Sequence, residues 1–381
     1  MNKISTVMEI DTKAFKHNIE EIKKYTPKHQ IMPIIKANAY GTYLNKEIEL
    51  VKEFDIVGVA KVDEGIKLRE IGYKNNILIL NQPDTIELNK IIEYNLTIGI
   101  SSKEFLNSIK EINKELKVHL EIETGMNRTG INLSELEEYI LKIANNKNII
   151  IEGIYTHLSS ADNDEEYTKK QLEIFDKAIS LTKNINTIKY IHALASSGIL
   201  NYLSEKTNTI RPGILLYGYY PSIETITKLD LIPVTKLKTK ITFLKTVEKN
   251  TSISYSRTYI TETITKVATI PIGYADGLKR MLSNKGYVVI NDKKCKIIGN
   301  ICMDSCMIDV TNIENVKVGD EVYIWDNKII TVDEIAKLCD TINYEILSTI
   351  DNKFIKFFNT DTLEKISELK YEKSEEWRWN S

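Results

Sequence analysis

Short apolar runs alternate with stretches of helical periodicity along the first half of the chain. The runs are typical of buried strands, and a helical pattern follows each of the first seven. The clearest helical pattern covers residues 165–183, where Leu172, Phe175 and Ile179 recur at spacings of three and four. The eight runs cover residues 31–35, 55–60, 76–80, 96–100, 117–123, 149–155, 189–193 and 214–217.

Eight buried strands joined by helices favour a closed (β/α)8 barrel, and we predict a TIM-like barrel over residues 11–230. The alternative is a doubly wound open sheet. A dinucleotide-binding sheet of that kind would carry GxGxxG after its first strand, and the sequence has no such motif there. In a barrel, functional residues follow the strands at the C-terminal face.

After about residue 230 the helical patterns give way to β-branched runs separated by Gly, Asn and Asp. We predict a mostly β domain over residues 231–365, joined by an N-terminal strand at residues 3–10, and a charged tail at 366–381. Asp11 follows that strand and could cap the first helix. The β-branched runs cover residues 236–247, 266–270, 287–290, 295–298 and 321–325.

The charge balance gives no sign of a nucleic-acid partner. The 381 residues include 51 Lys+Arg and 53 Asp+Glu, a formal net charge of −2, whereas nucleic-acid binders carry a basic excess. No apolar run reaches the length of a membrane span, and the N-terminus lacks the apolar stretch of a signal peptide. We therefore expect a cytoplasmic protein. Four cysteines without a CxxC pair, and only five histidines, predict no metal site.

Residues with reactive or charged side chains follow or adjoin the predicted strands. Lys36 directly follows the first run, and a desolvated amine there could form a Schiff base. Arg128, His157, Ser196 and Arg211 lie beside other runs and are residue types that bind an anionic cofactor or a carboxylate substrate. Each alone has an ordinary explanation, such as a surface lysine or a turn serine. Together on one predicted face, they indicate an active site.

Five local motifs give the chain a specific resemblance. It resembles the alanine racemase family, which are pyridoxal 5'-phosphate enzymes with a barrel followed by a β domain. The resemblance covers about residues 5–360. Its motifs are Lys36-Ala-Asn-Ala-Tyr40-Gly41, Arg211-Pro-Gly-Ile-Leu-Leu-Tyr-Gly218, Ser252-Ile-Ser-Tyr255, Ile272-Gly-Tyr-Ala-Asp-Gly277 and Gly299-Asn-Ile-Cys-Met-Asp304.

The resemblance implies a racemase with two proton carriers, one on each face of the substrate. Lys36 would hold the pyridoxal phosphate as a Schiff base and then serve the D face. Tyr255, supplied by the second subunit of a homodimer, would serve the L face. The reaction would interconvert L-alanine and D-alanine and supply D-alanine for peptidoglycan.

The resemblance also assigns the contacts around these two residues. Arg211 would face the pyridine nitrogen and His157 would hydrogen-bond Arg211. Arg128 and the backbone N–H of Met303 from the partner subunit would bind the substrate carboxylate. The remaining assignments are Tyr40, Ser196, Gly213 and Ile214 for the phosphate, and Tyr274 with Asp304 for the entry corridor.

The chain departs from the family pattern at several positions. Glu121 stands where many members carry a carbamylated lysine, and we interpret it as a built-in anion that orients Arg128. Ala195 replaces an asparagine before the phosphate-binding serine, and Asn352 falls on a tyrosine of a late active-site motif. The arginine-rich stretch after that tyrosine becomes residues 353–356, which contain two lysines. These changes put the phosphate contacts and the substrate preference in question.

Three other functions are open at this stage. A serine racemase or a mixed alanine/serine racemase is the main alternative, and the sequence also resembles the racemase domains of vancomycin-resistance serine racemases. A barrel-type decarboxylase shares the lysine and the β domain, but its cysteine and Gly-rich signatures are missing. A non-catalytic pyridoxal phosphate carrier would be a single barrel.

Overall fold

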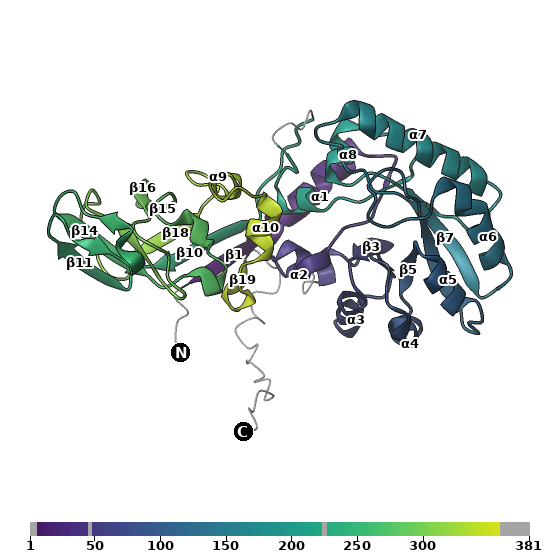
Figure 1. The fold of residues 1–381 in the computed structure, drawn as a ribbon, viewed down its shortest axis with the longest axis horizontal. Helices are drawn as coiled ribbons and strands as arrows, with labels where there is room; N and C mark the ends of the chain where they lie inside the picture. Colours follow the sequence, from purple (N-terminus) through teal and green to yellow (C-terminus); the bar gives the residue numbers. More distant parts are fainter. Residues whose placement is uncertain (1–5, 45–47, 223–226, 359–381) are drawn as a thin grey trace, which may run out of the picture.

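The structure, a computed structural model, describes residues 6–44, 48–222 and 227–358. The tail predicted at residues 366–381 lies outside them. The chain forms an elongated molecule of two lobes, with the helix-rich lobe and the β-rich lobe at opposite ends (Figure 1). The predicted order, an α/β barrel followed by a mostly β domain, is confirmed.

Eight short parallel strands close into the barrel. Strands β3 to β8 form one continuous parallel sheet in sequence order. A bridge between Ile34 and Gly58 continues it to β2, a bridge between Ala195 and Arg211 continues it to β9, and β2 pairs with β9. The strands are β2 (Gln30–Ile31), β3 (Ile56–Val59), β4 (Asn76–Ile79), β5 (Thr97–Ile100), β6 (Leu116–Glu121), β7 (Ile149–Tyr155), β8 (Tyr190–His192) and β9 (Thr209–Ile210).

Amphipathic helices surround these strands. In α7 all three predicted positions face the core: Phe175 is fully buried, and Leu172 and Ile179 are partly buried against it. Asp164 caps the helix by accepting the Tyr167 N–H. The helices of this lobe are α1 (Thr12–Tyr25), α2 (Lys36–Tyr40), α3 (Val62–Glu70), α4 (Leu88–Glu93), α5 (Lys103–Ile109), α6 (Leu136–Ala144), α7 (Glu165–Thr182) and α8 (Ser196–Asn201).

The prediction for the eighth strand was wrong. Residues 214–217 form the 3-10 helix η5 (Ile214–Tyr217), and the strand is the two-residue β9 just before it. All four η5 side chains are fully buried. A short apolar run that is buried on every side does not distinguish a strand from a buried helical turn.

The second lobe contains two main sheets. One has the order β16-β15-β18-β10-β1-β19 and the other the order β11-β14-β17. Its strands are β1 (Val7–Asp11), β10 (Thr235–Lys240), β11 (Phe243–Val247), β12 (Ser252–Ile253), β13 (Tyr259–Ile260), β14 (Thr265–Ile270), β15 (Tyr287–Ile290), β16 (Lys293–Lys296), β17 (Cys306–Asp309), β18 (Glu321–Trp325) and β19 (Ile355–Phe358); its helices are α9 (Val332–Leu338) and α10 (Asn343–Ser348).

The N-terminal strand ties the two ends of the chain together. Strand β1 pairs antiparallel with β10 and parallel with β19, so the first described strand lies inside the sheet of the second lobe. Asp11 then caps α1, its carboxylate accepting the backbone N–H of Lys13 and Ala14.

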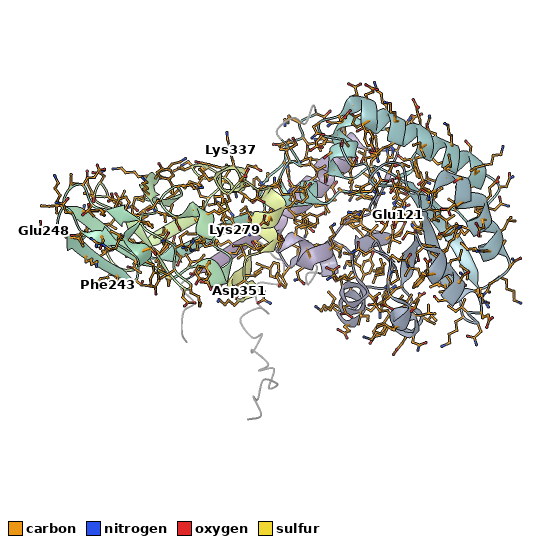
Figure 2. The ribbon with its side chains drawn as sticks, in the orientation of Figure 1. Glu121, Phe243, Glu248, Lys279, Lys337 and Asp351 are labelled. Carbon is orange, nitrogen blue, oxygen red and sulfur yellow. The ribbon has the colours of Figure 1, made fainter. Side chains whose placement is uncertain are left out.

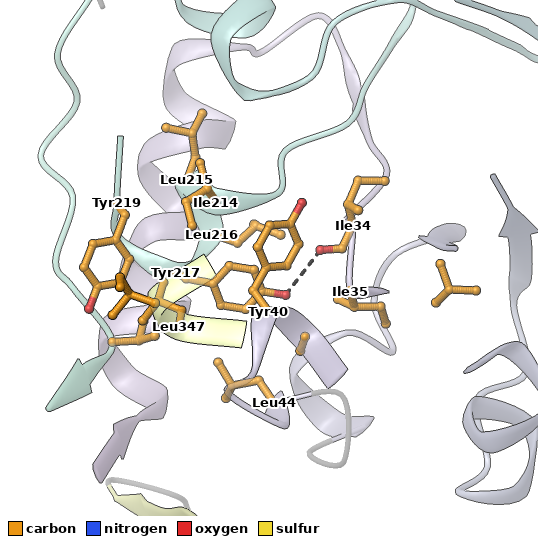
Figure 3. Close-up of a cluster of buried hydrophobic side chains, with 14 of the residues drawn as sticks. Ile34, Ile35, Tyr40, Leu44, Ile214, Leu215, Leu216, Tyr217, Tyr219 and Leu347 are labelled. Carbon is orange, nitrogen blue, oxygen red and sulfur yellow. Dashed lines mark hydrogen bonds between the residues drawn. The ribbon is translucent and has the colours of Figure 1, made fainter. Parts of the chain in front are cut away.

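Helix α10 connects the second lobe to the start of the barrel. Figure 3 shows Leu347 of α10 beside the cluster that contains Tyr40 and Tyr217. The Tyr217 hydroxyl donates to the Ile34 carbonyl at 3.2 Å, and the rings of Tyr40 and Tyr217 lie 4.9 Å apart between centroids. The second lobe therefore supports the segment that follows the first barrel strand.

Two features are absent from the described residues. None of their helices is both long enough and apolar enough to cross a membrane. Within the same residues, no group of three or more His, Cys, Asp or Glu side chains is arranged to hold a metal ion.

Candidate active site

A cavity of about 450 Å³ opens at the C-terminal end of the barrel strands. Figure 2 shows Glu121, one of its lining residues, inside the barrel lobe and far from Phe243 at the tip of the other lobe. Eight of the predicted site residues line this cavity, namely Lys36, Tyr40, Glu121, Arg128, His157, Ser196, Arg211 and Gly213.

Lys36 begins an unusual turn. Ala37, Asn38, Ala39 and Tyr40 all have φ between 50° and 56°, so the chain forms one left-handed helical turn after Lys36. For L residues this conformation costs about 1–2 kcal/mol each, and such strain persists only where the surroundings impose it.

Two contacts hold the turn in place. The Glu64 carboxylate accepts the Ala37 N–H at 2.6 Å and also the Ala60 and Lys61 N–H groups. Gly41 ends the turn with φ 79°, and a Cβ there would lie 2.2 Å from the Leu347 carbonyl oxygen. The strained turn is therefore clamped between α3 and α10.

The Lys36 amine lies in a cationic environment. Burial lowers the pKa of Lys36, and the charges of Arg128 and Arg211 lower it further, whereas Glu64 acts in the opposite direction. Among the described residues no carboxylate forms an ion pair with this amine, and Glu64 acts on it only through its charge. A lowered pKa increases the neutral fraction, which is the form that acts as nucleophile and base.

The Tyr40 hydroxyl, Ser196 and Gly213 form a small cradle at one end of the cavity. The Gly213 N–H donates to the Ser196 Oγ at 3.1 Å. A Cβ on Gly213 would lie 2.2 Å from the Tyr40 hydroxyl, so only glycine allows the tyrosine this position. Within the part of the chain that the structure describes, the Tyr40 hydroxyl has no protein partner and faces the cavity. Hydroxyls and backbone N–H groups of this kind suit a phosphate.

Arg211 is clamped from behind. Its Nη1 donates to the Nδ1 and to the carbonyl of His192, both at 2.8 Å. Its Nη2 donates to the Thr156 carbonyl at 2.8 Å, the Ala193 carbonyl at 3.2 Å and the His157 Nδ1 at 3.3 Å. These contacts use the four N–H bonds of the two terminal nitrogens.

The remaining donor of Arg211 is its Nε–H. It has no partner among the described residues, and Arg211 lines the cavity. Burial lowers the pKa of Arg211 to about 10, so the guanidinium still carries its charge at neutral pH. His157, in contrast, is neutral, because burial and the Arg211 charge lower its pKa to about 3.

The loop that carries Arg128 is preorganised by two glutamates. Glu123 accepts the backbone N–H groups of Gly125 and Asn127. Glu121 accepts the Thr129 hydroxyl at 2.9 Å through Oε1, while its buried Oε2 has no partner. Burial raises the pKa of Glu121, against the opposing effects of Thr129 and the Arg128 charge. No ion pair joins Glu121 to Arg128 within the described ranges.

Four predicted site residues lie on the second lobe and do not line the cavity. Tyr255, in the 3-10 helix η6 (Tyr255–Arg257), is 70% exposed, Met303 is 54% exposed and Tyr274 is 44% exposed. Asp304 is exposed as well. Ile214, the fourth predicted phosphate contact, is buried beside Gly213. One chain therefore presents the predicted site in two separate halves.

The comparisons with known proteins decide the family. Residues 10–221 match the family of the alanine racemase N-terminal domain, and residues 234–358 match that of its C-terminal domain. The chain belongs to the alanine racemase family. It is 40% identical over 366 residues to an alanine racemase of Methanococcus maripaludis, a match that covers 92% of this chain and 97% of the relative.

Solved structures of family members have the same fold. An alanine racemase of Clostridium difficile is 33% identical with a TM-score of 0.88, covering 94% of this chain and 97% of the other. An alanine racemase of Bacillus anthracis with bound L-Ala-P is 30% identical with a TM-score of 0.87, covering 93% and 95%.

The departures from the family pattern fall in different places. Ala195 lines the cavity next to Ser196. Asn352 lies outside it, exposed at the start of the 3-10 helix η9 (Asn352–Phe354). Lys353 donates to Asp276 at 2.6 Å and so ties this segment to the Gly-Tyr-Ala-Asp-Gly motif.

Several supporting residues of the site were not predicted. Glu64 and Tyr344 shape the Lys36 turn, the latter by placing its ring 5.8 Å from that of Tyr40. His192 and His119 lie behind Arg211. The two histidines interrupt otherwise apolar runs, and that interruption was the available signal.

Proposed function

We propose that this member of the alanine racemase family is a pyridoxal 5'-phosphate-dependent racemase that interconverts L-alanine and D-alanine. The observation that carries the proposal is the cavity itself, which combines an amine of lowered pKa, Lys36, with the buried cation of Arg211 and the exposed cation of Arg128. When bound, pyridoxal phosphate supplies a conjugated ring that delocalises the electron pair left at Cα after the proton departs.

The residues present fit that group. Tyr40, Ser196 and the backbone at Gly213 would hold its phosphate in the cradle that a glycine keeps open. Lys36, Arg128 and Arg211 give this part of the cavity an excess of positive charge, which suits a phosphate and a substrate carboxylate. The free Nε–H of Arg211 would be a donor for the ring nitrogen.

Arg211 influences the chemistry through what it cannot do. A guanidinium has no lone pair to accept a proton, so with the cofactor bound Arg211 would donate to the ring nitrogen and disfavour protonation of that atom. A carboxylate in its place would do the opposite. Arg211 would thereby limit how far the cofactor stabilises negative charge at Cα, and so favour return of a proton to Cα over side reactions.

Racemisation needs a proton carrier on each face of Cα. We propose that Lys36 Nζ takes or returns the proton on the D face. Tyr255 of a second copy of the chain would carry the proton on the L face, with the neutral His157, held through Nδ1 by Arg211, close to its phenol. The exposure of Tyr255 in the single chain supports this division.

The first test is chiral chromatography of the purified protein with cofactor, offered L-alanine, L-serine and L-lysine separately. Rapid formation of D-alanine would support the proposal. Dominant D-serine would make the protein a serine racemase and give Ala195 or Asn352 a role in specificity. Absence of a D-product from all three would refute an alanine racemase. Rescue of a D-alanine auxotroph would test the further proposal of a role in peptidoglycan supply.

A second test addresses the shared site. Lys36→Ala and Tyr255→Phe subunits are co-expressed with different tags. If each site takes its tyrosine from the other copy, a mixed dimer has one intact site, and random mixing restores about a quarter of wild-type activity. If Tyr255 serves its own chain, no subunit pairing restores a site and the mixture stays as inactive as its parents.

A further inference from the structure

Behind Arg211, two fully buried histidines continue the hydrogen-bonded chain into the barrel. Arg211 Nη1 lies 2.8 Å from His192 Nδ1, and His192 Nε2 lies 2.8 Å from His119 Nδ1. Both histidines have no exposed surface. This row of side chains runs from Arg211, directly after β9, to His192 on β8 and His119 on β6.

The direction of these hydrogen bonds is fixed by chemistry. A guanidinium only donates, so His192 Nδ1 must accept and cannot carry a proton. Burial and the Arg211 charge hold the pKa of His192 well below its usual range, so the ring is neutral and its proton is on Nε2. That Nε2–H donates to His119 Nδ1, which leaves the His119 proton on Nε2.

Local structure is shaped to hold His119 in this position. A register shift between β6 and β7 at Val118 and His119 brings His119 opposite Gly153, where a Cβ would lie 2.5 Å from His119 Nδ1. The Tyr190 ring stacks on the other side, 5.4 Å between centroids. A bulge of this kind re-aims a side chain.

The presence of a histidine at position 119 is not explained by its own hydrogen bonds. The His119 Nε2 is buried without a partner, which costs free energy that an apolar side chain would avoid. The imidazole therefore lowers stability at one nitrogen while offering an acceptor to His192 at the other. That balance indicates a role for the Nδ1 acceptor beyond packing.

We infer that His119 is a positioning residue that locks His192 in its Nε2–H tautomer and thereby fixes the orientation of the Arg211 guanidinium. Without an acceptor at His119, His192 can rotate its ring or move its proton to Nδ1, which would repel the Arg211 N–H. Arg211 would then lose one of its five acceptors, and its guanidinium at the cavity wall would be held less firmly. The catalytic consequence rests on the proposed function, in which the Nε–H of Arg211 faces the cofactor nitrogen.

The test compares His119→Leu, which removes the acceptor, with His119→Asn, whose Oδ1 replaces Nδ1. Selective 15N labelling of histidine in the full-length enzyme reports each tautomer, and the chain has only five histidines to assign. We expect wild type and His119→Asn to keep the His192 proton on Nε2. In His119→Leu, His192 should populate the other tautomer.

Catalysis supplies the second readout. We expect His119→Leu to lower kcat about 10–100-fold, the usual cost of losing an outer partner of an oriented group, and to shift the absorbance of the bound cofactor. His119→Asn should recover most of the loss. Wild-type tautomer, spectrum and kcat in His119→Leu would overturn the inference.

Two outcomes remain informative if variants fail. Should His119→Leu not fold, the 15N spectrum of the wild-type protein still tests the inference. A His192 proton on Nδ1 in that spectrum would overturn it. Should wild type racemise no amino acid, the proposed function fails, whereas the tautomers still decide whether His119 locks His192.

Discussion

The two lobes hold their site residues in opposite ways. In the barrel, Arg211 is 3% exposed and Glu121 4% exposed, and each is fixed by contacts from its own chain. On the β lobe, Tyr255 is 70% exposed and Met303 54% exposed. The two lobes match the N-terminal and the C-terminal domain of the same family.

The two lobes differ in what holds their site residues in position. A buried group is oriented by its neighbours when the chain folds, so contacts within one chain fix its geometry. An exposed group has no such support within one chain, and for the β-lobe residues we propose that a second copy supplies it. Substitutions of the buried barrel residues should therefore also disturb the neighbours that hold them, whereas substitutions of the exposed β-lobe residues should leave the fold of the single chain unchanged.

The largest expected effect is that of Tyr255→Phe. Loss of the phenolic proton carrier should lower racemisation about 10²–10⁴-fold. Cofactor binding and the thermal midpoint should change little, because the ring is retained and only the hydroxyl is lost. Tyr287→Phe on the same lobe, with Tyr287 39% exposed, is the matched control. A large loss of cofactor binding in Tyr255→Phe would break the comparison.

Gly213→Ala should act through packing. The new Cβ would lie 2.2 Å from the Tyr40 hydroxyl and must displace it from the cradle. We expect cofactor affinity to fall about tenfold or more, as overpacking costs about 1–3 kcal/mol. Fluorescence titration of the apo-protein measures the affinity.

A double variant checks the cause of that loss. Tyr40→Phe removes the hydroxyl that the new Cβ would meet, so the effects of Gly213→Ala and Tyr40→Phe should be less than additive. Full additivity would show that the glycine acts through something other than this contact.

Acid should destabilise the barrel through its neutral histidines. Burial lowers the folded-state pKa of His119 and His157 to about 3, against about 6.5 when unfolded. Below pH 6.5 the unfolded chain binds more protons, so stability falls as pH falls. Linkage gives a loss of up to about 2 kcal/mol per histidine at pH 5.

Urea midpoints at pH 7 and pH 5 measure that loss. His119→Asn should make the pH dependence shallower. Tyr287→Phe, which removes no histidine, is the control and should leave the pH dependence unchanged. An equal slope in wild type and His119→Asn would contradict the assignment.

The smallest effect is expected from Glu121→Gln. Loss of the anion near Arg128 should raise KM for alanine about fivefold, or about 1 kcal/mol, with kcat unchanged. Added bicarbonate should have no influence on wild type or variant. An unchanged KM would show that the interpretation of Glu121 as an orienting anion is wrong.

Much of the fold could be predicted because periodicity reports burial. Seven of the eight predicted barrel runs contain or adjoin a strand, and α7 begins where predicted. The eighth run failed because η5 is buried on all sides. Helix α10 was missed because a six-residue helix is too short to show a period.

The site was predictable in its residues and less so in its geometry. Ala37 and Ala39 are strong formers of right-handed helix, yet both adopt positive φ because Glu64 and the Leu347 carbonyl constrain the turn. Such contacts come from segments that are distant in sequence from the turn, so no local sequence pattern predicts them. The same holds for His119 and Gly153.

The pairing of β1 with β10 and β19 has a consequence for protein synthesis. Strand β1 leaves the ribosome well before its partners, which begin at Thr235 and Ile355. At about 5–20 residues per second, roughly 10–50 s pass before β10 can join it. During that interval the barrel can complete while β1 stays unpaired, and the charges of Glu9 and Asp11 discourage its association with other nascent chains. The sheet of the second lobe is therefore completed by strands that are synthesised before and after the barrel.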